Sequence, residues 1–173
     1  MQFSALGIKT MASIIEITTD EQKNELVEVI GKSNATVARD LNLTQENAPT
    51  NPAFITYEAL EESMNKGLAM YGFYEDKKLV GCVGIEDPQK DDTFYIERLA
   101  VLPDYRHKGI GRRLMDYAFE KVKSNNGKSV SIGIIDENKV LKEWYIKYGF
   151  EETGTKNFDH LPFTVCFMQK SVE

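Results

Sequence analysis

Basic residues and glycines gather where an apolar, strand-like segment leads into a helical pattern. Residues 101–115 read VLPDYRHKGIGRRLM. The group consists of Arg106, Lys108, Gly109, Gly111, Arg112 and Arg113. The first turn of a helix has unpaired backbone N–H groups and a partial positive charge. Because glycine has no Cβ, a ligand can approach such a backbone closely. The pattern predicts an anion site, with phosphate the best guest.

Two common phosphate-binding motifs do not fit this segment. A P-loop requires Gly-x-x-x-x-Gly-Lys-Ser/Thr, which the sequence lacks. A dinucleotide fingerprint requires a third glycine where Leu114 stands. Two structural alternatives stay open: the glycines form only a tight turn, or the basic side chains form a solvated face. For Arg113 the solvated face is the favoured interpretation, and His107 is expected at the surface beside the phosphates.

The rest of the chain predicts alternating strands and helices. β-branched or apolar segments predict strands at residues 13–19, 69–75, 78–87, 92–101, 129–135, 150–155 and 163–169. Apolar residues at helical spacing predict helices after Asp20, which we expect to be an N-cap, and over 57–65, 109–123 and 138–148. Asp76 and Lys77 predict a hairpin turn. The polar stretch 42–52 predicts a long loop, which is often functional in a compact domain.

This order of elements predicts one α/β (α+β) domain. The middle strands favour an antiparallel meander, and the strand–helix–strand unit around 92–135 favours a parallel pair. We expect a twisted, mixed, mostly antiparallel sheet of about seven strands with helices on both faces. Residues 1–12 are expected to be an N-terminal extension, with Met11 as an alternative start, and 13–173 the functional domain.

Composition narrows the class of protein. A chain of 173 residues fits one domain with a full core. Its net charge of −6 argues against nonspecific nucleic-acid binding. We find no signal peptide and no apolar run long enough to span a bilayer, so we expect a cytoplasmic protein without a membrane partner. Cys82 and Cys166 are expected to be buried reduced thiols, with a disulfide as the lesser alternative.

Two stretches together resemble one known family. The first, IERLAVLPDYRHKGIGRRLM at residues 96–115, resembles the acetyl-CoA motif of the GNAT superfamily of N-acetyltransferases. The second, ENKVLKEWYIKYGFEETG at residues 137–154, resembles the motif that follows it in that family. With the order of elements, the resemblance covers roughly residues 13–170. It implies the GNAT-like fold, acetyl-CoA as cosubstrate and an acetyl transfer to an amine.

The resemblance also implies roles for particular residues. The backbone of Leu99, Ala100 and Val101 would pair with the pantetheine amides as an added strand. Asn138 would contact the pantetheine arm, and Tyr145 would stand near the sulfur and protonate the leaving thiolate. The pyrophosphate would be held by the backbone amides and by Arg112 in the segment Arg106, His107, Lys108, Gly109, Ile110, Gly111 and Arg112.

Acetyl transfer to an amine needs a base for the amine, stabilisation of the tetrahedral oxyanion and an acid for the thiolate. Glu97 is the candidate base, and alternation along a strand predicts that it shares a face with Leu99 and Val101. Backbone N–H groups near Leu99 to Val101 would polarise the thioester carbonyl. Attack would be direct, in one ternary complex. As alternatives, Tyr145 is a core tyrosine beside Trp144, and Glu97 is salt-bridged or simply lines the pocket.

Two histidines without a nearby Cys, Asp or Glu constellation argue against a metal site. The acceptor is expected between residues 39–59 and 156–162, and His160 either lines that pocket or belongs to a turn. Acidic residues near the first segment, namely Glu46, Glu58, Glu61 and Glu62, weakly favour a cationic amine. The aromatic residues available to line the acceptor site are Phe54, Tyr57, Tyr71, Tyr74 and Phe158.

A small-molecule primary amine is the favoured acceptor, with a polyamine, an amino-acid derivative and an aminoglycoside all open. A protein or peptide acetyltransferase, and an acyl-CoA-binding module without turnover, are the competing functions. A homodimer through the last strands is possible, although residues 163–169 fit a buried strand equally well.

Overall fold

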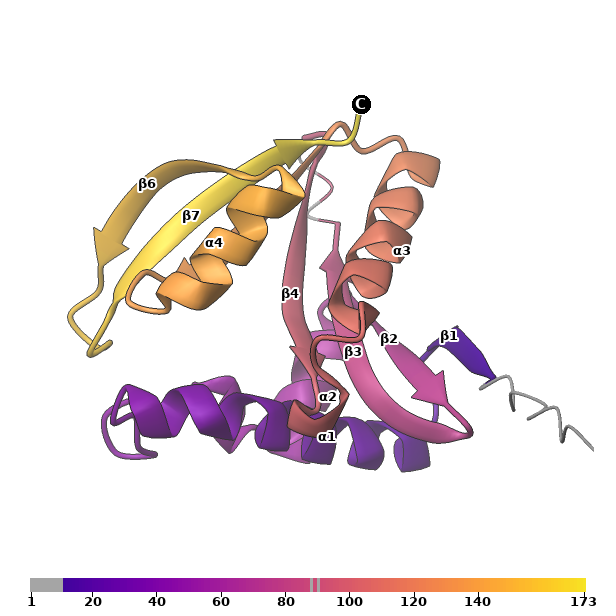
Figure 1. The fold of residues 1–173 in the computed structure, drawn as a ribbon, viewed down its shortest axis with the longest axis horizontal. Coiled ribbons are helices and arrows are strands. Elements are labelled where there is room, and N and C mark those ends of the chain that lie inside the picture. The colour runs from indigo at the N-terminus through magenta and orange to yellow at the C-terminus, as the bar shows by residue number, and fades with distance from the viewer. Residues whose placement is uncertain (1–10, 88, 90) are drawn as a thin grey trace, which may run out of the picture.

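The computed structural model describes residues 11–87, 89 and 91–173, and its strands form one mixed sheet in the order β1-β2-β3-β4-β5-β7-β6. The strands are β1 Ala12–Glu16, β2 Leu68–Glu75, β3 Lys78–Glu86, β4 Thr93–Val101, β5 Ser129–Ile135, β6 Glu151–Asn157 and β7 Thr164–Ser171. The helices are α1 Asp20–Asp40, α2 Tyr57–Asn65, α3 Ile110–Ser124 and α4 Lys139–Tyr148, with 3₁₀ turns at Pro52–Phe54 and Pro103–Tyr105. The predicted fold class is confirmed (Figure 1).

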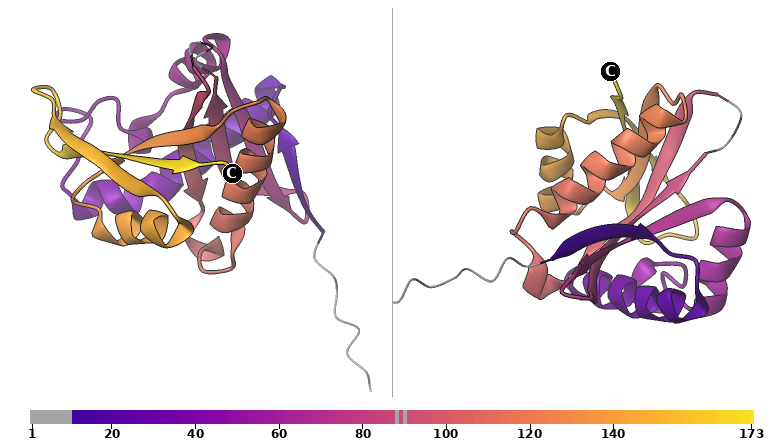
Figure 2. Two further views of the ribbon diagram at one scale, coloured as in Figure 1. Left: turned by 90° about the horizontal axis from the view of Figure 1, so that it is seen from above. Right: turned by 90° about the vertical axis from the view of Figure 1, so that its right-hand side faces the viewer.

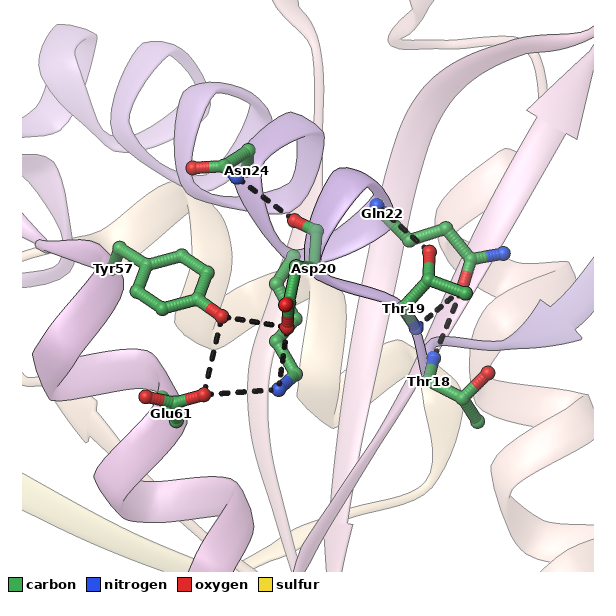
Figure 3. A network of polar contacts seen from close by, with 8 residues as sticks. Thr18, Thr19, Asp20, Gln22, Asn24, Tyr57 and Glu61 are labelled. Carbon is green, nitrogen blue, oxygen red and sulfur yellow. Dashed lines mark hydrogen bonds and ion pairs between the residues drawn. The ribbon is translucent and has the colours of Figure 1, made fainter.

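Local chemistry explains where several elements begin and turn. Asp76 and Lys77 have φ of 49° and 69°, the left-handed values that a two-residue hairpin needs between β2 and β3. The expected N-cap at Asp20 is wrong by one residue. Thr19 caps α1 instead, because its side chain accepts from the Gln22 amide while the Gln22 side chain accepts from the Thr19 amide (Figure 3).

The sheet carries helices on both faces, and each face has its own apolar core. In the right-hand view of Figure 2, α3 and α1 lie on opposite sides of the strands. Leu26, Ile30 and Leu60 of α1 and α2 pack with Met70 and Cys82 on one face. The other core combines α3, α4 and strand residues, among them Leu114, Tyr145, Phe73, Ile96 and Val130. The sheet therefore separates an α1/α2 side from an α3/α4 side.

A β-bulge interrupts β4. Cys82 lies opposite Ala100 but Gly84 lies opposite Glu97, so β4 has one extra residue between these pairs. Arg98 occupies the bulge with φ of 53°, an uncommon conformation for a non-glycine residue.

Because of the bulge, the prediction that Glu97 shares a face of the sheet with Leu99 and Val101 is wrong. Gly84, its partner on β3, faces Met70 and Leu68, which belong to the α1/α2 core. Leu99 and Val101 pack instead against the α3/α4 core. Glu97 therefore lies on the opposite face from Leu99 and Val101, because one inserted residue breaks the period-two alternation.

β4 and β5 pair over only part of their length. This parallel pairing, predicted from the sequence, joins Thr93, Phe94 and Tyr95 to the first three residues of β5. Beyond Tyr95 the two strands diverge, and β6, β7 and α4 lie away from α1 (Figure 1). The second half of β4 therefore has one edge without a strand partner.

The predicted N-terminal extension lies largely outside the described residues, which begin at Met11, and β1 starts at Ala12. Within the part of the chain that the structure describes, no helix combines the length and apolar character needed to cross a membrane.

Candidate active site

A pocket of about 890 Å³ occupies the gap between β4 and β5. Its volume is within the range of ordinary small-molecule sites. Its walls come from α1, residues 48–52, β4, the start of α3, β5, α4 and the β6–β7 hairpin. Most of the residues predicted to do chemistry lie in these walls, although the sequence separates them by up to 48 positions.

The turn before α3 presents a row of free backbone donors to this pocket. Among the described residues, no acceptor pairs with the six amide N–H groups of residues 107–112. Gly109 caps the helix with φ of 80°, and His107 has φ of 61°, so the chain turns sharply here. A Cβ on Gly109 would meet no atom within 4 Å, which leaves open space above the turn. The geometry fits a phosphate group at the helix N-terminus, and the tight turn is part of the same arrangement.

Arg106 differs from its predicted role. Its amide already donates to the Pro103 carbonyl at 3.2 Å, so it is not available to a phosphate. Its guanidinium turns inward and donates to the carbonyls of Val101 at 3.2 Å and Ser33 at 2.6 Å, and to the Thr36 hydroxyl at 3.3 Å. Arg106 therefore fastens the glycine turn to α1 across the top of β4.

Replacing Arg106 with methionine is expected to lower the free energy of unfolding by about 2–4 kcal/mol, because two carbonyls lose a charged donor. Urea denaturation monitored by circular dichroism measures the loss. Arg113→Met is the matched control, since Arg113 lies nearby on α3, with its guanidinium over the Phe73 ring at 4.7 Å and outside the pocket walls. An Arg106→Met loss no larger than that of the control would contradict the fastening role.

Other basic residues of the turn divide between the pocket and the surface. His107 and Arg112 line the pocket, and the Arg112 guanidinium lies over the Tyr148 ring at 5.5 Å. Lys108 does not line it, and its ammonium lies over the Tyr105 ring at 4.9 Å. The side chain of Arg112 is therefore placed for an anion at the turn, whereas Lys108 can offer its backbone amide.

The free edge of β4 offers backbone groups to the gap. Leu102 donates its amide to Val80 on β3, and N–H and C=O groups of successive strand residues point in opposite directions. Ala100 therefore faces β3, whereas Leu99 and Val101 face the gap. The predicted strand-like pairing fits both backbone groups of Leu99 and the N–H of Val101, whose carbonyl accepts from Arg106. It does not fit Ala100, whose backbone groups face Cys82 on β3.

Glu97 lines the pocket from the α1/α2 side. Burial raises the pKa of its carboxyl, while the neighbouring Arg98 charge opposes that shift and Glu86 adds to it. Among the described residues no Lys or Arg nitrogen lies within 4.0 Å of Glu97, so the salt-bridge alternative does not hold there. A carboxylate with a raised pKa and free oxygens can accept a proton from an amine.

Tyr145 is both a core tyrosine beside Trp144 and a residue of the pocket wall, the two positions that the sequence left open. Its side chain is only 5% exposed, and its ring packs in T-shaped geometry against Trp144 at 5.1 Å and Phe150 at 5.4 Å. The residue also lines the pocket, and its hydroxyl forms no hydrogen bond with any described residue. Burial raises the pKa of the phenol, so the hydroxyl keeps its proton at neutral pH and can donate it.

Asn138 caps α4, at the start of the helix that the sequence predicts over 138–148. Its Oδ1 accepts from the Leu141 amide at 3.3 Å, and it lines the pocket beside Leu141. The Nδ2 group makes no contact with a described acceptor, so it is available to a ligand.

The aromatic residues expected at the acceptor site lie elsewhere. Tyr57 donates to Asp20 at 2.8 Å and contacts Glu61 at 3.1 Å, at the outer junction of α1 and α2 (Figure 3). Tyr74 contacts Glu25, and none of the five predicted aromatics lines the pocket. The aromatic residues in the pocket walls are Tyr95, Tyr105, Trp144, Tyr145, Phe163 and Phe167.

The acidic residues expected near the acceptor also lie outside the pocket walls. Glu61 pairs with Lys23 at 3.2 Å, and Glu62 pairs with Lys66. His160 packs near Phe158, which fits a turn rather than the pocket. The argument for a cationic acceptor from these charges therefore fails, although residues 48–52 and Leu161 do reach the pocket as expected.

Both cysteines are free and buried, as predicted. Burial raises the pKa of Cys82 to about 12, so it is not a thiolate at neutral pH. Cys166 lies near Asp136 and Glu152, whose carboxylates both hold the Lys142 ammonium at 2.7 Å. This ammonium occupies the charge position that a cation would need.

Comparisons with known proteins agree with this architecture. A profile of the acetyltransferase (GNAT) domain family matches residues 38–171. A curated N-acetyltransferase of Schizosaccharomyces pombe, whose own activity is uncharacterised, is 35% identical over 85 residues. That match covers 48% of this chain and 58% of the relative's length.

Solved structures of low sequence identity share the fold. The ribosomal-protein-S18-alanine N-acetyltransferase of Escherichia coli has a TM-score of 0.74 at 12% identity, over 94% of this chain and 95% of its own. The PaiA N-acetyltransferase of Thermoplasma acidophilum, solved in complex with coenzyme A, has a TM-score of 0.71 at 20% identity, over 93% and 99% of the two chains. The family profile matches most of the chain, and the shared fold agrees with it. The chain therefore belongs to the GNAT family of acetyltransferase domains.

Proposed function

We propose that this protein transfers an acetyl group from acetyl-CoA to the primary amine of a small molecule. The observation that carries the proposal is the shared pocket, which joins the free amides of residues 107–112 to Glu97 and Tyr145. An anion-binding turn alone fits many phosphate ligands. Its combination with a base on one side of β4 and an acid on the other fits acyl transfer from a phosphorylated thioester.

The chain's residues divide the work between the two sides of the sheet. The amides of 107–112, with Arg112, bind the pyrophosphate on the α3 side, and Leu99 and Val101 pair with the pantetheine arm. The Nδ2 group of Asn138 contacts the same arm. The acceptor enters from the α1/α2 side, where Glu97 lies.

The reaction proceeds by direct attack in one ternary complex. Glu97 takes the proton of the amine, directly or through a water, and the amine nitrogen bonds to the thioester carbon. A backbone N–H near Leu99 to Val101 at the free edge of β4, beyond those that pair with the pantetheine arm, stabilises the oxyanion. The carbon–sulfur bond then breaks, and Tyr145 gives its proton to the departing thiolate. The products are an N-acetylated amine and coenzyme A, and no metal takes part.

Two competing functions are separable by experiment. An acyl-CoA-binding module without turnover would bind the cosubstrate and release no thiol with any amine. A peptide acetyltransferase would prefer a peptide panel to a panel of small amines. The two free cysteines fit a reducing compartment, and we place the activity in the cytoplasm. A homodimer through the last strands stays a prediction.

Acetyl-CoA is expected to stabilise the protein against heat, whereas ATP and NAD are not. A ligand at ~100 times its dissociation constant adds about 2.7 kcal/mol, which corresponds to a shift in Tm of roughly 5–10 °C for a chain of this size. Differential scanning fluorimetry with each ligand measures it. A shift with ATP or NAD but none with acetyl-CoA would contradict the proposed function.

A further inference from the structure

Two buried polar side-chain atoms lack a hydrogen-bond partner among the described residues: Ser33 Oγ and Arg98 Nε. Both residues line the pocket between β4 and β5. Buried polar groups in native proteins are nearly always paired, so an unpaired one calls for an explanation. Their position at one pocket suggests that the missing partner is a ligand of that pocket.

Arg98 is the more informative of the two because it carries a full charge. Its Nη2 donates to the Ser63 hydroxyl at 2.9 Å, and this is its one side-chain hydrogen bond within the described chain. A guanidinium has five N–H donors, so most of them are unused. No described carboxylate lies within 4.0 Å of it. A half-buried guanidinium with no carboxylate in ion-pair contact leaves room for a bound group to supply that contact.

The backbone of Arg98 adds a second sign of constraint. Its φ of 53° places a long side chain at the bulge of β4, where a left-handed conformation is costly for any residue other than glycine. Residues held in such conformations cluster at ligand sites. The bulge turns the side chain toward α2, on the side of the sheet where Glu97 also lies.

The other basic side chains of the pocket are already hydrogen-bonded within the protein or lie at the proposed phosphate end. The Arg106 guanidinium donates hydrogen bonds to Val101, Ser33 and Thr36. His107 belongs to the turn before α3, and Arg112 lies in the first turn of that helix. Among the described residues that line the pocket, Glu97 is the one carboxylate, and its proposed role is to accept the proton of the acceptor amine.

We propose that Arg98 binds a carboxylate of the acceptor, so that the acetylated amine belongs to an amino acid or a similar amino-carboxylate. The inference rests on the proposed acetyl transfer and narrows its acceptor. Glu97 and Arg98 present adjacent negative and positive charges, which match the ammonium and carboxylate of such a molecule. A polyamine would bring a second positive charge toward Arg98, which is unfavourable. The N-terminal residue of a protein carries a peptide bond in place of its α-carboxylate, so it offers no negative charge at that position.

The remaining wall indicates what else the acceptor carries. Val37 on α1, Pro52 and the hairpin residue Phe163 form an apolar part of the pocket. An apolar side chain would be buried there favourably. We therefore choose leucine, methionine and phenylalanine as probes.

The test compares each amino acid with its amide and with the amine that lacks the carboxyl group. Thiol release at saturating acetyl-CoA gives kcat/KM for each member of the series. The amide is the stringent comparison because its amine loses a proton more readily. We expect the wild-type protein to favour the amino acid by at least ~10-fold, the size of a charge-assisted hydrogen bond.

Substitutions of Arg98 test whether this residue is the source of the preference for the amino acid over its amide. In Arg98→Gln, which keeps an amide donor near Ser63, the preference should fall to within ~3-fold through a rise in KM, and Arg98→Lys should retain part of it. Arg39→Gln is the matched control, because Arg39 lies on the exposed face of α1 with 77% of its side chain accessible. Its preference should equal that of the wild type.

A binding measurement keeps the proposal testable if Arg98→Gln folds poorly. With coenzyme A present, N-acetyl-leucine should stabilise the wild-type protein in a thermal scan more than N-acetyl-leucinamide. Equal use of amino acids and amides, or a preference that survives in Arg98→Gln, overturns the carboxylate site. Turnover of neither series while acetyl-CoA still stabilises the protein also overturns it. Loss of acetyl-CoA stabilisation overturns the proposed function instead.

Discussion

Glu97→Gln is expected to lower kcat by about 10²- to 10⁴-fold while acetyl-CoA still binds, because general base catalysis contributes a factor of that size. The substitution keeps the shape of the side chain and removes its ability to take a proton. Thiol release at saturating acetyl-CoA and acceptor measures the loss. The acetyl-CoA shift in Tm should equal that of the wild type, since Glu97 lies on the α1/α2 side of β4, away from the turn before α3 that is proposed to bind the pyrophosphate.

The pH profile gives an independent reading of the same residue. Burial raises the pKa of Glu97, so the acid limb of kcat/KM should lie above the usual range of a glutamate. The acceptor amine also titrates in such a profile, and the limb that belongs to Glu97 is the one that disappears in Glu97→Gln. A rate within ~3-fold of the wild type would assign the proton transfer to another group.

Stability should move in the opposite direction to activity. A raised pKa means that the folded protein binds this proton more strongly than the unfolded chain does. The resulting stability is present at low pH and falls as pH rises from the unfolded to the folded pKa, and the loss is small because the Glu97 side chain is exposed to solvent. Glu97→Gln should therefore be as stable as the wild type at pH 7 or slightly more stable. A large loss of stability would instead indicate a structural role.

The elements of the fold follow from local patterns that sequence carries directly. The helix over Tyr57–Asn65 and the strand over Ser129–Ile135 have the predicted bounds, because apolar spacing and flanking turn residues mark both ends. The turn proposed to bind the pyrophosphate is equally local. Gly109 and Gly111 precede the helical pattern within a few residues, so the free amides of the turn could be predicted without knowing what packs around them.

What escaped prediction depends on contacts between distant segments. The bulge at Arg98 adds one residue to β4, and nothing within the strand pattern signals it except a charged residue among apolar ones. Arg106 looked like a phosphate ligand because its inward partner, α1, lies some 70 positions earlier in the chain. The prediction of the aromatic residues that line the acceptor site was wrong for the same reason, since the Tyr57 hydroxyl contacts Asp20 on α1 and does not face the pocket.

Tyr145→Phe is expected to lower kcat by about 10²-fold and to leave acetyl-CoA affinity nearly unchanged, because only the departing thiolate needs the phenolic proton. The ring, which packs against Trp144 and Phe150, is the same in both proteins. Tyr148→Phe is the matched control on the same helix. Its hydroxyl donates to Asp116 at 2.7 Å outside the pocket walls, so its loss should not change the rate.

Stability separates the acid from a merely structural tyrosine. The Tyr145 hydroxyl makes no hydrogen bond with a described residue, so removing it sacrifices no protein contact and should not lower the free energy of unfolding. A core tyrosine with no role in transfer would leave both rate and stability unchanged in the phenylalanine variant. Since burial raises the pKa of this phenol, an acidic role also requires that wild-type kcat show no basic limb where a free tyrosine would ionise, near pH ~10. A fall in kcat well below that pH, or a full rate in Tyr145→Phe, would assign protonation of the thiolate to water.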